Sequence, residues 1–502
     1  MADATIHPAA SPPALPSAGK APGWLSIYVR PFALTVILLS AVCCLIGAAA
    51  RPDPGWALTG LINFLTMGVL VFGLIRSRYP SLVSPIALMI LVMLVSTPAR
   101  YLYFSLSDPA WDIKWFLAGR DGTFFVAGAL LMLIFSIAFV TAYRLRLRVP
   151  DLSALKVFDR APTVVILTAV LPLIGIALFG LVMYMTRTGG SFADLLTFQP
   201  QRRAVLEGAT RLSFGQYLEI AEWLFPIGIL LIGISIRQQR LTRPLLLATG
   251  LGLVLFYAMF KFNVAVRGDI MLALIILGMV GFLRSRRVPK AALVGGAVIV
   301  AAAFTAITSG RYEHNANYAA MARDEPVMVM MDGAFGAFNL GGFIASSQTI
   351  DAIPERLDYQ YGATLLEPFW VIIPRTIWPT KPRTIGMHLL EAFQGTEVML
   401  ARRGGGNSAG LAAEGFINFG WFGVPLVGFF FGLMMNLFYT TLVRGMLENG
   451  AACAIYAYAT VIMVYDGFGY NFAKGFIELM VKGACLALAW GVVMIGMRLA
   501  RR

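Results

Sequence analysis

The chain has 502 residues, of which 58% are hydrophobic and only 13% charged, and its formal net charge is +14. Its mean hydropathy of +0.75 is far above that of soluble proteins, so this length does not translate into soluble domains. The composition excludes a soluble enzyme and predicts an all-α polytopic membrane protein. The positive charge is not evidence for nucleic acid, because most basic residues follow the predicted topology and no aromatic–basic nucleic-acid motif is present.

Residues 1–25 are rich in Ala, Pro and Ser, which predicts a disordered cytoplasmic tail and no cleavable signal peptide. About twelve apolar windows follow, each close to the roughly 20 residues that cross a bilayer as a helix. They lie near 31–50, 56–75, 81–97, 123–143, 163–186, 216–236, 243–262, 266–283, 289–309, 415–442, 451–466 and 475–499. The predicted order is a tail over 1–25, transmembrane helices 1–9 over 26–309, an outer loop region with interfacial helices over 310–414, and transmembrane helices 10–12 over 415–502.

Basic residues set the predicted orientation. With the N-terminus in the cytoplasm, the cytoplasmic segments hold Arg76, Arg78, Arg144, Arg146, Arg148, Lys156, Arg160, Arg237, Arg240, Arg243, Arg284, Arg286, Arg287, Lys290, Arg444, Arg498, Arg501 and Arg502. Short loops on the other side are poorer in Lys and Arg, as the positive-inside rule expects. The cysteines lie within predicted spans, which favours packing over a disulfide or metal role; they are Cys43, Cys44, Cys453 and Cys485.

A further set of basic residues falls in the outward segments, where that rule does not account for them. They are Arg187, Arg202, Arg203, Arg211, Arg267, Arg311, Arg323, Arg356, Arg375, Lys381, Arg383, Arg402 and Arg403. A guanidinium group binds phosphate through two parallel hydrogen bonds and keeps its proton. Solvated loop charge explains many of these residues singly. It explains Arg267 and Arg375 less well, because one is flush with the bilayer and the other has apolar neighbours.

The segment 361–382 reads YGATLLEPFWVIIPRTIWPTKP, with two Trp, four Pro, Arg375 and Lys381. Such a run cannot be a spanning helix, and irregular backbone near a membrane persists only where protein or water satisfies its amides. The segment indicates an anion-binding site at the membrane surface, and the expected ligand is a lipid-linked phosphate. Beside it, 326–347 suggests a surface or re-entrant helix pair, and Thr384 is expected to cap an amphipathic helix over 385–394.

Two residues are candidates for proton transfer, each with a plainer alternative. Glu414 opens the tenth predicted span, where it either complements the helix dipole or acts as a partly desolvated general base. His388 is either a polar-face residue of the 385–394 helix or a catalytic group. Tyr465, Asp466 and Tyr470 end the eleventh span on the same side, where aromatic anchoring explains the tyrosines better than sugar stacking does.

A resemblance concentrates in 361–423. The residues Tyr361-Gly362, Ile373-Pro374-Arg375, Trp378-Pro379 and Lys381-Pro382, followed by Glu414 and Asn418-Phe419-Gly420, are similar to bacterial Wzy-type oligosaccharide repeat-unit polymerases. The pair Arg267-Gly268 also resembles those proteins. The resemblance implies a GT-C-like fold in the bacterial inner membrane with its active site facing the periplasm. It also implies a metal-independent, inverting glycosyl transfer with no cofactor.

The partners implied are an undecaprenyl-pyrophosphate-linked oligosaccharide donor and acceptor, the lipid bilayer and a chain-length regulator, and no nucleic acid. In this interpretation Arg375, Lys381 and Arg267 bind pyrophosphate, with Arg311 and Arg211 as weaker candidates. Arg383, Tyr361, Trp378 and Asn418 complete the substrate-binding set, no residue binds metal, and Glu414 is the base with His388 in reserve.

Two other classes remain open from the sequence. A glycan ligase shares the chemistry and topology and differs only in the acceptor. A lipid-linked oligosaccharide flippase or transporter would place polar residues within spans and show repeated broken helices. The polar residues of the predicted outer loops, and the absence of an evident internal repeat, favour an enzyme over a transporter. The product, whether O-antigen, capsule or exopolysaccharide, is left open.

Overall fold

The computed structural model describes residues 23–106, 120–148, 153–187, 219–237, 240–263, 267–286, 341–371, 373, 377–395, 408–445 and 447–499. Within them, ten helical segments are long and apolar enough to cross a membrane. They are α1 (Val29–Ala50), α2 (Pro54–Ile75), α3 (Pro85–Leu94) continued by the π-helix η2 (Val95–Ala99) and α4 (Arg100–Leu106), α5 (Thr123–Tyr143), α7 (Thr163–Arg187), α11 (Pro244–Asn263), α12 (Arg267–Ser285), α20 (Leu411–Gly445), α21 (Gly450–Ile462) continued by the π-helix η7 (Met463–Phe468), and α22 (Phe472–Leu499). The chain is therefore a multi-pass helical membrane protein.

Shorter elements join these spans. They are η1 (Gly23–Leu25), η4 (Ser153–Leu155), α6 (Lys156–Arg160), α10 (Leu224–Ser235), α16 (Gly342–Ala352), α17 (Ala363–Val371), α18 (Ile385–Gln394) and the antiparallel pair β1 (Ile236–Arg237) and β2 (Arg240–Leu241). Ten of the twelve predicted windows correspond to the ten spans. The window 216–236 instead holds the 12-residue helix α10, whose residues are all buried, and 289–309 lies outside the described residues.

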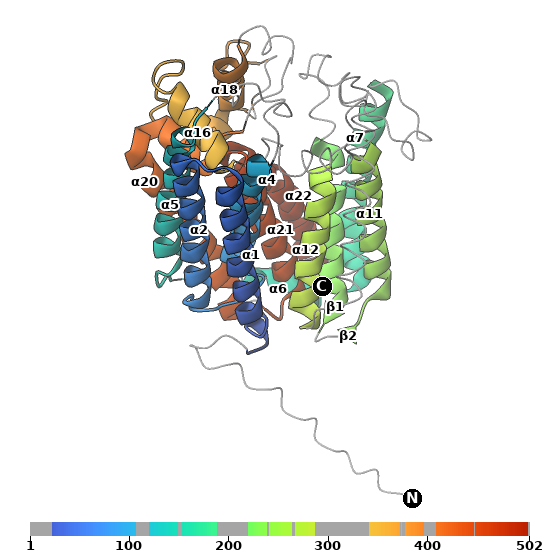
Figure 1. Cartoon of the computed structure of the whole chain (residues 1–502). Helices are drawn as coiled ribbons and strands as arrows, with labels where there is room; N and C mark the ends of the chain where they lie inside the picture. The colour runs from blue at the N-terminus through green and yellow to red at the C-terminus, as the bar shows by residue number, and fades with distance from the viewer. Residues whose placement is uncertain are drawn as a thin grey trace, which may run out of the picture.

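The helices form a bundle with two distinct ends (Figure 1). The short helices α16 and α18 lie at one end, called the α18 end, and β1 and β2 lie at the opposite end. Helix α5 packs against α2, α16 and α20, while α10 packs against α11 and α21. Close approach needs small residues: a Cβ atom on Gly128 of α5 would lie 2.1 Å from the Phe343 carbonyl oxygen of α16. The bundle therefore brings α16, which precedes the Trp- and Pro-rich segment, into the protein core.

Helix α20 departs from the continuous span predicted over 415–442. Phe419 (φ −141°, ψ 23°) and Gly420 (φ 60°, ψ −150°) interrupt it, so a short half-helix precedes the longer membrane segment. The conformation of Gly420 belongs to a region that essentially only glycine occupies. On either side of the break Gly415 and Gly423 touch, because a Cβ atom on Gly423 would lie 2.0 Å from the Gly415 carbonyl oxygen. The sequence did not predict this break, because Phe419 and Gly420 lie within a continuous apolar run.

Two further expectations need correction. Gly23–Leu25, which the prediction placed in the tail, form a 3-10 turn in which Leu25 is buried and Trp24 packs against Phe282. The helix α18 has the predicted bounds, but the Thr384 side chain makes no capping hydrogen bond. The apolar face of α18 is also used within the protein, since Ile385 and Leu389 are buried and the helix packs on α16.

Candidate functional site

Glu414 lies in the half-helix of α20 and is almost fully buried, with 1% of its surface exposed. The Thr364 hydroxyl of α17 donates to its Oε1 at 2.8 Å, and the Phe472 amide at the start of α22 donates to its Oε2 at 2.7 Å. Both carboxylate oxygens thus accept hydrogen bonds from the protein itself. This arrangement fits a group that joins three helices, and the predicted role as a base stays a prediction.

Asn418 connects the same half-helix to the segment before α17. Its side-chain oxygen accepts from the Gly362 amide at 2.8 Å, and its amide group donates to the Thr364 hydroxyl at 2.6 Å. The backbone carbonyl of Asn418 accepts from the Tyr361 amide, and that of Ile417 accepts from the Gln360 amide. These bonds satisfy carbonyls that a helix end leaves free. Asn418 is therefore a structural link between two parts of the resembling sequence.

Glu367 of α17 was not selected at the sequence level. Its side chain is buried, and its Oε2 accepts from the Ile385 amide at 3.0 Å, which makes it the cap that Thr384 does not provide. Burial raises the pKa of Glu367 to about 7, with a smaller contribution from the nearby Glu414 carboxylate. Thr364, Glu367, Glu414 and Asn418 with Gly362 are called the Glu414 cluster below.

Lys381 is only partly exposed, and its ammonium group is engaged with backbone. It donates to the carbonyl oxygens of Val371 at 2.9 Å and Ile373 at 2.8 Å. These bonds tie Lys381 to residues that precede Arg375 in the sequence. Lys381 thus binds backbone of the preceding segment, and its predicted contact with pyrophosphate stays a prediction.

The other described candidates lie at the surface of the α18 end. Tyr361 is 79% exposed and Trp378 38% exposed, and Arg383 forms an ion pair with Glu391 at 3.3 Å. His388 is half-buried, and burial together with the Arg383 charge lowers its pKa, which favours the neutral, proton-accepting imidazole. These four side chains are accessible enough to meet a substrate.

The remaining predicted residues cannot be placed with their side chains. Arg375, Arg311 and Arg211 lie outside the described residues. Arg267 is the first residue of α12, and only its backbone position is described. The adjoining Gly268 lies against the π-helix η7, because a Cβ atom on Gly268 would be 2.5 Å from the Tyr465 hydroxyl. The glycine of the Arg267-Gly268 pair is thus needed for close packing.

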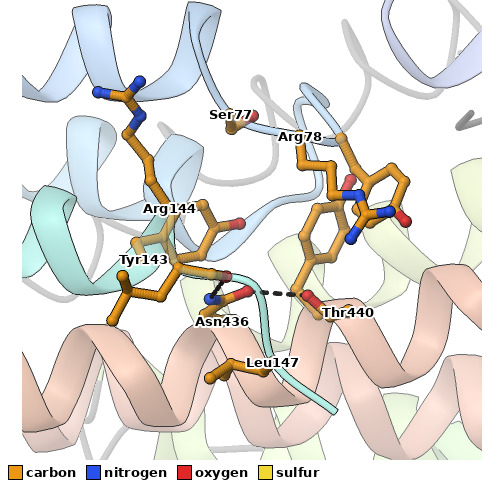
Figure 2. Close-up of a pocket in the computed structure, with 10 residues that line it drawn as sticks. Ser77, Arg78, Tyr143, Arg144, Leu147, Asn436 and Thr440 are labelled. Atoms are coloured by element: carbon orange, nitrogen blue, oxygen red, sulfur yellow. Dashed lines mark hydrogen bonds between the residues drawn. The ribbon is translucent and has the colours of Figure 1, made fainter. Parts of the chain in front are cut away.

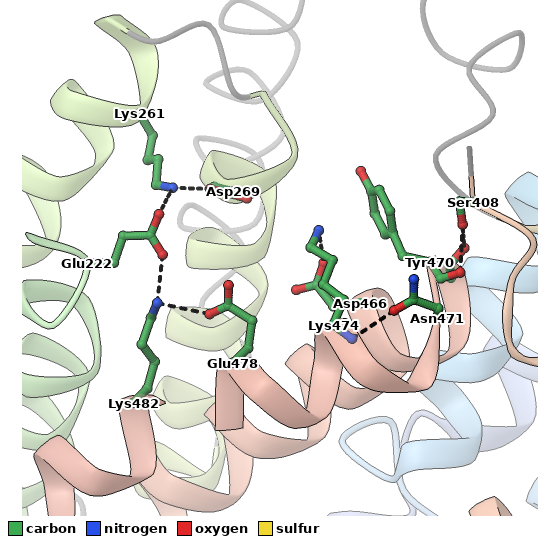
Figure 3. Close-up of polar contacts among 11 residues, drawn as sticks. Glu222, Lys261, Asp269, Ser408, Asp466, Tyr470, Asn471, Lys474, Glu478 and Lys482 are labelled. Atoms are coloured by element: carbon green, nitrogen blue, oxygen red, sulfur yellow. Dashed lines mark hydrogen bonds and ion pairs between the residues drawn. The ribbon is translucent and has the colours of Figure 1, made fainter. Parts of the chain in front are cut away.

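A second polar cluster lies among the spans, and the sequence analysis missed it (Figure 3). The Lys482 ammonium group of α22 contacts Glu219 at 2.7 Å, Glu222 at 2.8 Å and Glu478 at 3.0 Å. The Lys261 ammonium group of α11 contacts Glu222 and, at 2.6 Å, Asp269 of α12. These six residues are called the Lys482 network. Lys482 is 2% exposed, so its charge is held inside the bundle.

The network was visible in principle from the sequence. Glu219 and Glu222 fall in the apolar window 216–236, and Glu478 and Lys482 are four residues apart in the window 475–499. Such ionisable residues within spans are functional candidates by default and seek a partner. The candidate residues were all taken from the outer segments, so this signal within the spans was not used. The sequence does not show which of these residues form ion pairs, because the pairs join residues from four separate helical segments.

The three carboxylates of Glu219, Glu222 and Glu478 come close enough together to hold a metal ion. The Lys482 ammonium group already contacts all three of them. A built-in cation thus occupies the position that a metal would take. The donor set fits an ion-paired lysine better than a metal centre.

A neighbouring ion pair, formed by Asp466 and Lys474, lies beside the Lys482 network (Figure 3). Asp466 of η7 contacts the Lys474 ammonium group at 2.5 Å, and that group also lies 3.6 Å from the centre of the Tyr470 ring. The carbonyl of Tyr470 accepts hydrogen bonds from Gly410 and from the Ser408 hydroxyl. Helix α22 therefore connects the two groups of residues. Its first residue, Phe472, bonds to the Glu414 cluster, and Lys482, further along the helix, belongs to the Lys482 network.

One small cavity is found where α2 and α5 end, on the predicted cytoplasmic side (Figure 2). Arg78, Arg144 and three tyrosines help to line it. Asn436 on its floor donates to the Leu145 carbonyl at 2.8 Å and accepts from the Thr440 hydroxyl at 2.8 Å. The arginines here belong to the set that the positive-inside pattern explains, so this cavity is not the candidate site.

A scan of protein-family models finds no match to this chain, and searches of curated proteins and of solved structures find none either. The fold and the polar clusters define the class, which is a multi-pass, all-α membrane protein.

Proposed function

We propose that this protein is an integral membrane glycosyltransferase that polymerises undecaprenyl-pyrophosphate-linked oligosaccharide repeat units on the periplasmic face of a bacterial inner membrane. One observation supports this most. Asn418 of the Asn418-Phe419-Gly420 motif bonds to both amides of the Tyr361-Gly362 motif, at 3.1 Å and 2.8 Å. Two separate parts of the resembling sequence therefore build one assembly, at the end of the bundle that also carries Trp378, Lys381 and His388.

In the proposed reaction a hydroxyl group of one lipid-linked repeat unit attacks the anomeric carbon of the growing glycan. The pyrophosphate leaving group gains negative charge as its bond to that carbon breaks. Fixed cations stabilise this charge more in the transition state than in the ground state, which is the condition for catalysis. Arg375 and Arg267 are assigned this role. Lys381 binds the carbonyls of Val371 and Ile373, which precede Arg375 in the sequence. A single displacement inverts the anomeric centre.

Reconstitution tests this directly. Purified protein in liposomes is given synthetic undecaprenyl-pyrophosphate repeat units, and products are resolved by length over time. A ladder of glycans that differ by one repeat is the expected result. Repeat units that stay single, with protein that remains folded, would contradict the proposal.

Variants of Arg375 test the cation role. Alanine removes both the charge and the bidentate fork, whereas lysine keeps the charge alone. Charge-assisted bonds of roughly 1.5–3 kcal/mol predict a loss of about ten- to a hundredfold for Arg375→Ala, with Arg375→Lys in between. Chain lengths and rates like those of the parent in an equally abundant Arg375→Ala protein would remove this residue from the site.

The orientation has its own test. Glu355 is exposed and follows α16 at the α18 end, so Glu355→Cys should react with an impermeant maleimide in intact spheroplasts. A cysteine at Arg146, which is exposed and follows α5, is the matched control and should react only after lysis. The reverse pattern would place the proposed chemistry on the cytoplasmic side and overturn it.

A ligase with the same chemistry is the nearest alternative. A deletion strain separates the two when its surface glycan is resolved by length. Loss of a polymerase leaves glycan of a single repeat on its final carrier, and loss of a ligase leaves no glycan transferred.

A second class, the transport of lipid-linked glycan, has a specific observation in its favour. The Lys482 network places charges within spans, and α20 is broken at Phe419 and Gly420, both of which are features of transporters. This weakens the sequence-based preference, which relied on polar residues gathering in the outer loops. Reconstitution distinguishes the classes, because transport moves repeat units between leaflets without joining them.

A further inference from the structure

The Lys482 network contains more acid than base. Four carboxylates, those of Glu219, Glu222, Asp269 and Glu478, face two ammonium groups, those of Lys261 and Lys482. The formal excess is two negative charges in a region where burial makes unpaired charge costly. Uptake of a proton by one carboxylate lowers this excess. The network is thus built to accept protons.

The network is also open on one side. Glu222 and Lys482 are nearly closed off, but the Glu219 side chain is 40% exposed and the Asp269 side chain 26% exposed. Glu219 lies in a helical turn just before α10. Its Oε2 accepts from Lys482, and no hydrogen bond to its Oε1 is found among the described residues. Glu219 therefore has the most exposed side chain of the network, and its Oε1 is the oxygen that makes no hydrogen bond with the described residues.

Glu414 offers the opposite geometry. It is 1% exposed, and each of its oxygens already accepts a hydrogen bond. A general base must come within hydrogen-bond reach of the proton that it removes. Glu219 meets that condition more readily than Glu414 does.

The position of the network agrees with such a role. Asp269 lies in the first turn of α12, two residues after Arg267, which is a proposed pyrophosphate ligand. Helix α22 carries Glu478 and Lys482 and begins at Phe472, which bonds to the Glu414 cluster. The network therefore adjoins, through two helices, the parts of the chain assigned to the substrate.

We propose that Glu219 is the general base of the transfer, with Lys482 holding it in place. This inference rests on the proposed function and names its proton acceptor. As the acceptor oxygen forms its bond to the anomeric carbon, its proton passes to Glu219 Oε1. The bond from that carbon to the pyrophosphate oxygen breaks, and its electron pair leaves with the pyrophosphate. The proton is later released to water from the exposed side of Glu219.

The charged groups that face Glu219 are Glu222 on its own segment and Glu478 and Lys482 on α22. Lys261 and Asp269 form the next layer of the network. A single ammonium group that is shared among three carboxylates stabilises the negative charge of each one less than it would stabilise that of a single partner. This sharing keeps Glu219 able to take up a proton beside a lysine.

The test measures turnover by purified Glu219→Gln protein with lipid-linked repeat units across a range of pH. Glutamine keeps the size and the bond to Lys482 but cannot accept the proton. The expected result is a loss of about 10²–10⁴-fold in kcat, with a smaller change in KM. The parent rate should rise with pH as the base loses its proton, and the residual rate of the variant should lack that rise. Glu219→Asp, which keeps a carboxylate, should recover part of the rate.

Glu448→Gln is the matched control, since Glu448 is a partly exposed carboxylate that pairs with Arg286 at the other end of the bundle. It should retain the rate and pH profile of the parent. Thermal unfolding of each variant separates lost chemistry from lost folding. Parent-like turnover and pH profile in folded Glu219→Gln, or an effect on KM alone, would overturn the inference and leave the proposed function standing. Absence of polymer from the unaltered protein would instead contradict the proposed function, and the inference with it.

Discussion

The Glu414 cluster and the Lys482 network share helix α22 but stabilise their buried carboxylates by different means. Around Glu414 the donors are neutral, namely the Thr364 hydroxyl and the Phe472 amide. Around Lys482 the partners are charged, and three carboxylates surround one ammonium group. Neutral donors fix the position of a carboxylate without supplying a positive charge. A cation that is shared among several carboxylates allows one of them to bind and release a proton. Under the proposed function, the Glu414 cluster holds the fold and the Lys482 network contains the groups assigned to proton transfer.

The largest effect is expected at Lys482. Lys482→Met leaves three carboxylates without their common cation, and breaking a buried ion pair from one side costs about 3–5 kcal/mol. The measurement is the midpoint of thermal unfolding in detergent. Arg286→Met is the control, because its pair with Glu448 is partly exposed and should contribute at most about 1 kcal/mol.

A second variant checks the cause. If excess negative charge is what destabilises Lys482→Met, then adding Glu478→Gln should recover part of the lost stability. Equal midpoints for Lys482→Met and its parent would show that the network is not held by Lys482. The contrast with the Glu414 cluster would then disappear.

The sequence predicted the spans well, because a run of about 20 apolar residues leaves few options in a bilayer. It did not predict the break in α20, since Phe419-Gly420-Trp421 continues an apolar run and only the backbone of Gly420 departs from a helix. It also did not predict the Lys482 network. That network depends on residues far apart in sequence, such as Glu222 and Lys482, and no local pattern specifies which helices are neighbours.

The candidate site stays a prediction, and the structure shows only how its described residues are engaged. Of the motifs that carry the resemblance, Tyr361-Gly362 and Asn418-Phe419-Gly420 are in contact, because Asn418 bonds to Gly362 across 56 positions of sequence. What the residue types could not reveal is whether a polar group faces substrate or protein. Glu414 and Lys381 are engaged with the protein, and only their contacts show this. Glu367 caps α18 in place of the expected Thr384, because its side chain reaches the Ile385 amide from another helix.

The second prediction concerns pH and the Glu414 cluster. The pKa of Glu367 rises from an ordinary value of 4.5 to about 7 because the carboxyl is buried. The folded protein therefore binds this proton more tightly than the unfolded chain does. The stabilisation is fully present below pH 4.5 and is lost as the pH rises through about 7, and it amounts to at most roughly 3 kcal/mol.

Glu367→Gln tests this, since an amide can still accept from Ile385 but never becomes charged. Unfolding midpoints of parent and variant are compared between pH 5 and pH 8. The parent should lose stability across this interval, and the variant should lose less. Parallel curves for the two proteins would show that Glu367 keeps the same protonation state on unfolding.

The third prediction concerns the break in α20 that shapes the Glu414 cluster. Gly420→Ala forces a side chain into a backbone conformation that only glycine adopts readily, at a cost of about 1–3 kcal/mol. Gly68→Ala in α2 is the control, because a Cβ atom there meets nothing within 4 Å. It should be neutral or stabilising by up to about 1 kcal/mol. Equal effects from the two variants would mean that the break is not a requirement of the fold.

The smallest effect is expected at Glu414 itself, and it bears most directly on the comparison. In Glu414→Gln an NH2 group replaces one carboxylate oxygen. The side chain then accepts a hydrogen bond from only one of its two donors, and the other donor must reorient. The Thr364 hydroxyl can turn and accept, so the expected loss is about 0.5–1.5 kcal/mol of stability. Turnover per folded molecule should fall by less than tenfold, because the carboxylate positions α17 and α22 without receiving the proton. A loss of about 10²–10⁴-fold in kcat with unchanged stability would instead identify Glu414 as the base, as its place in the sequence first suggested. Measured beside Glu219→Gln in the same assay, the two variants assign the base to one cluster or the other.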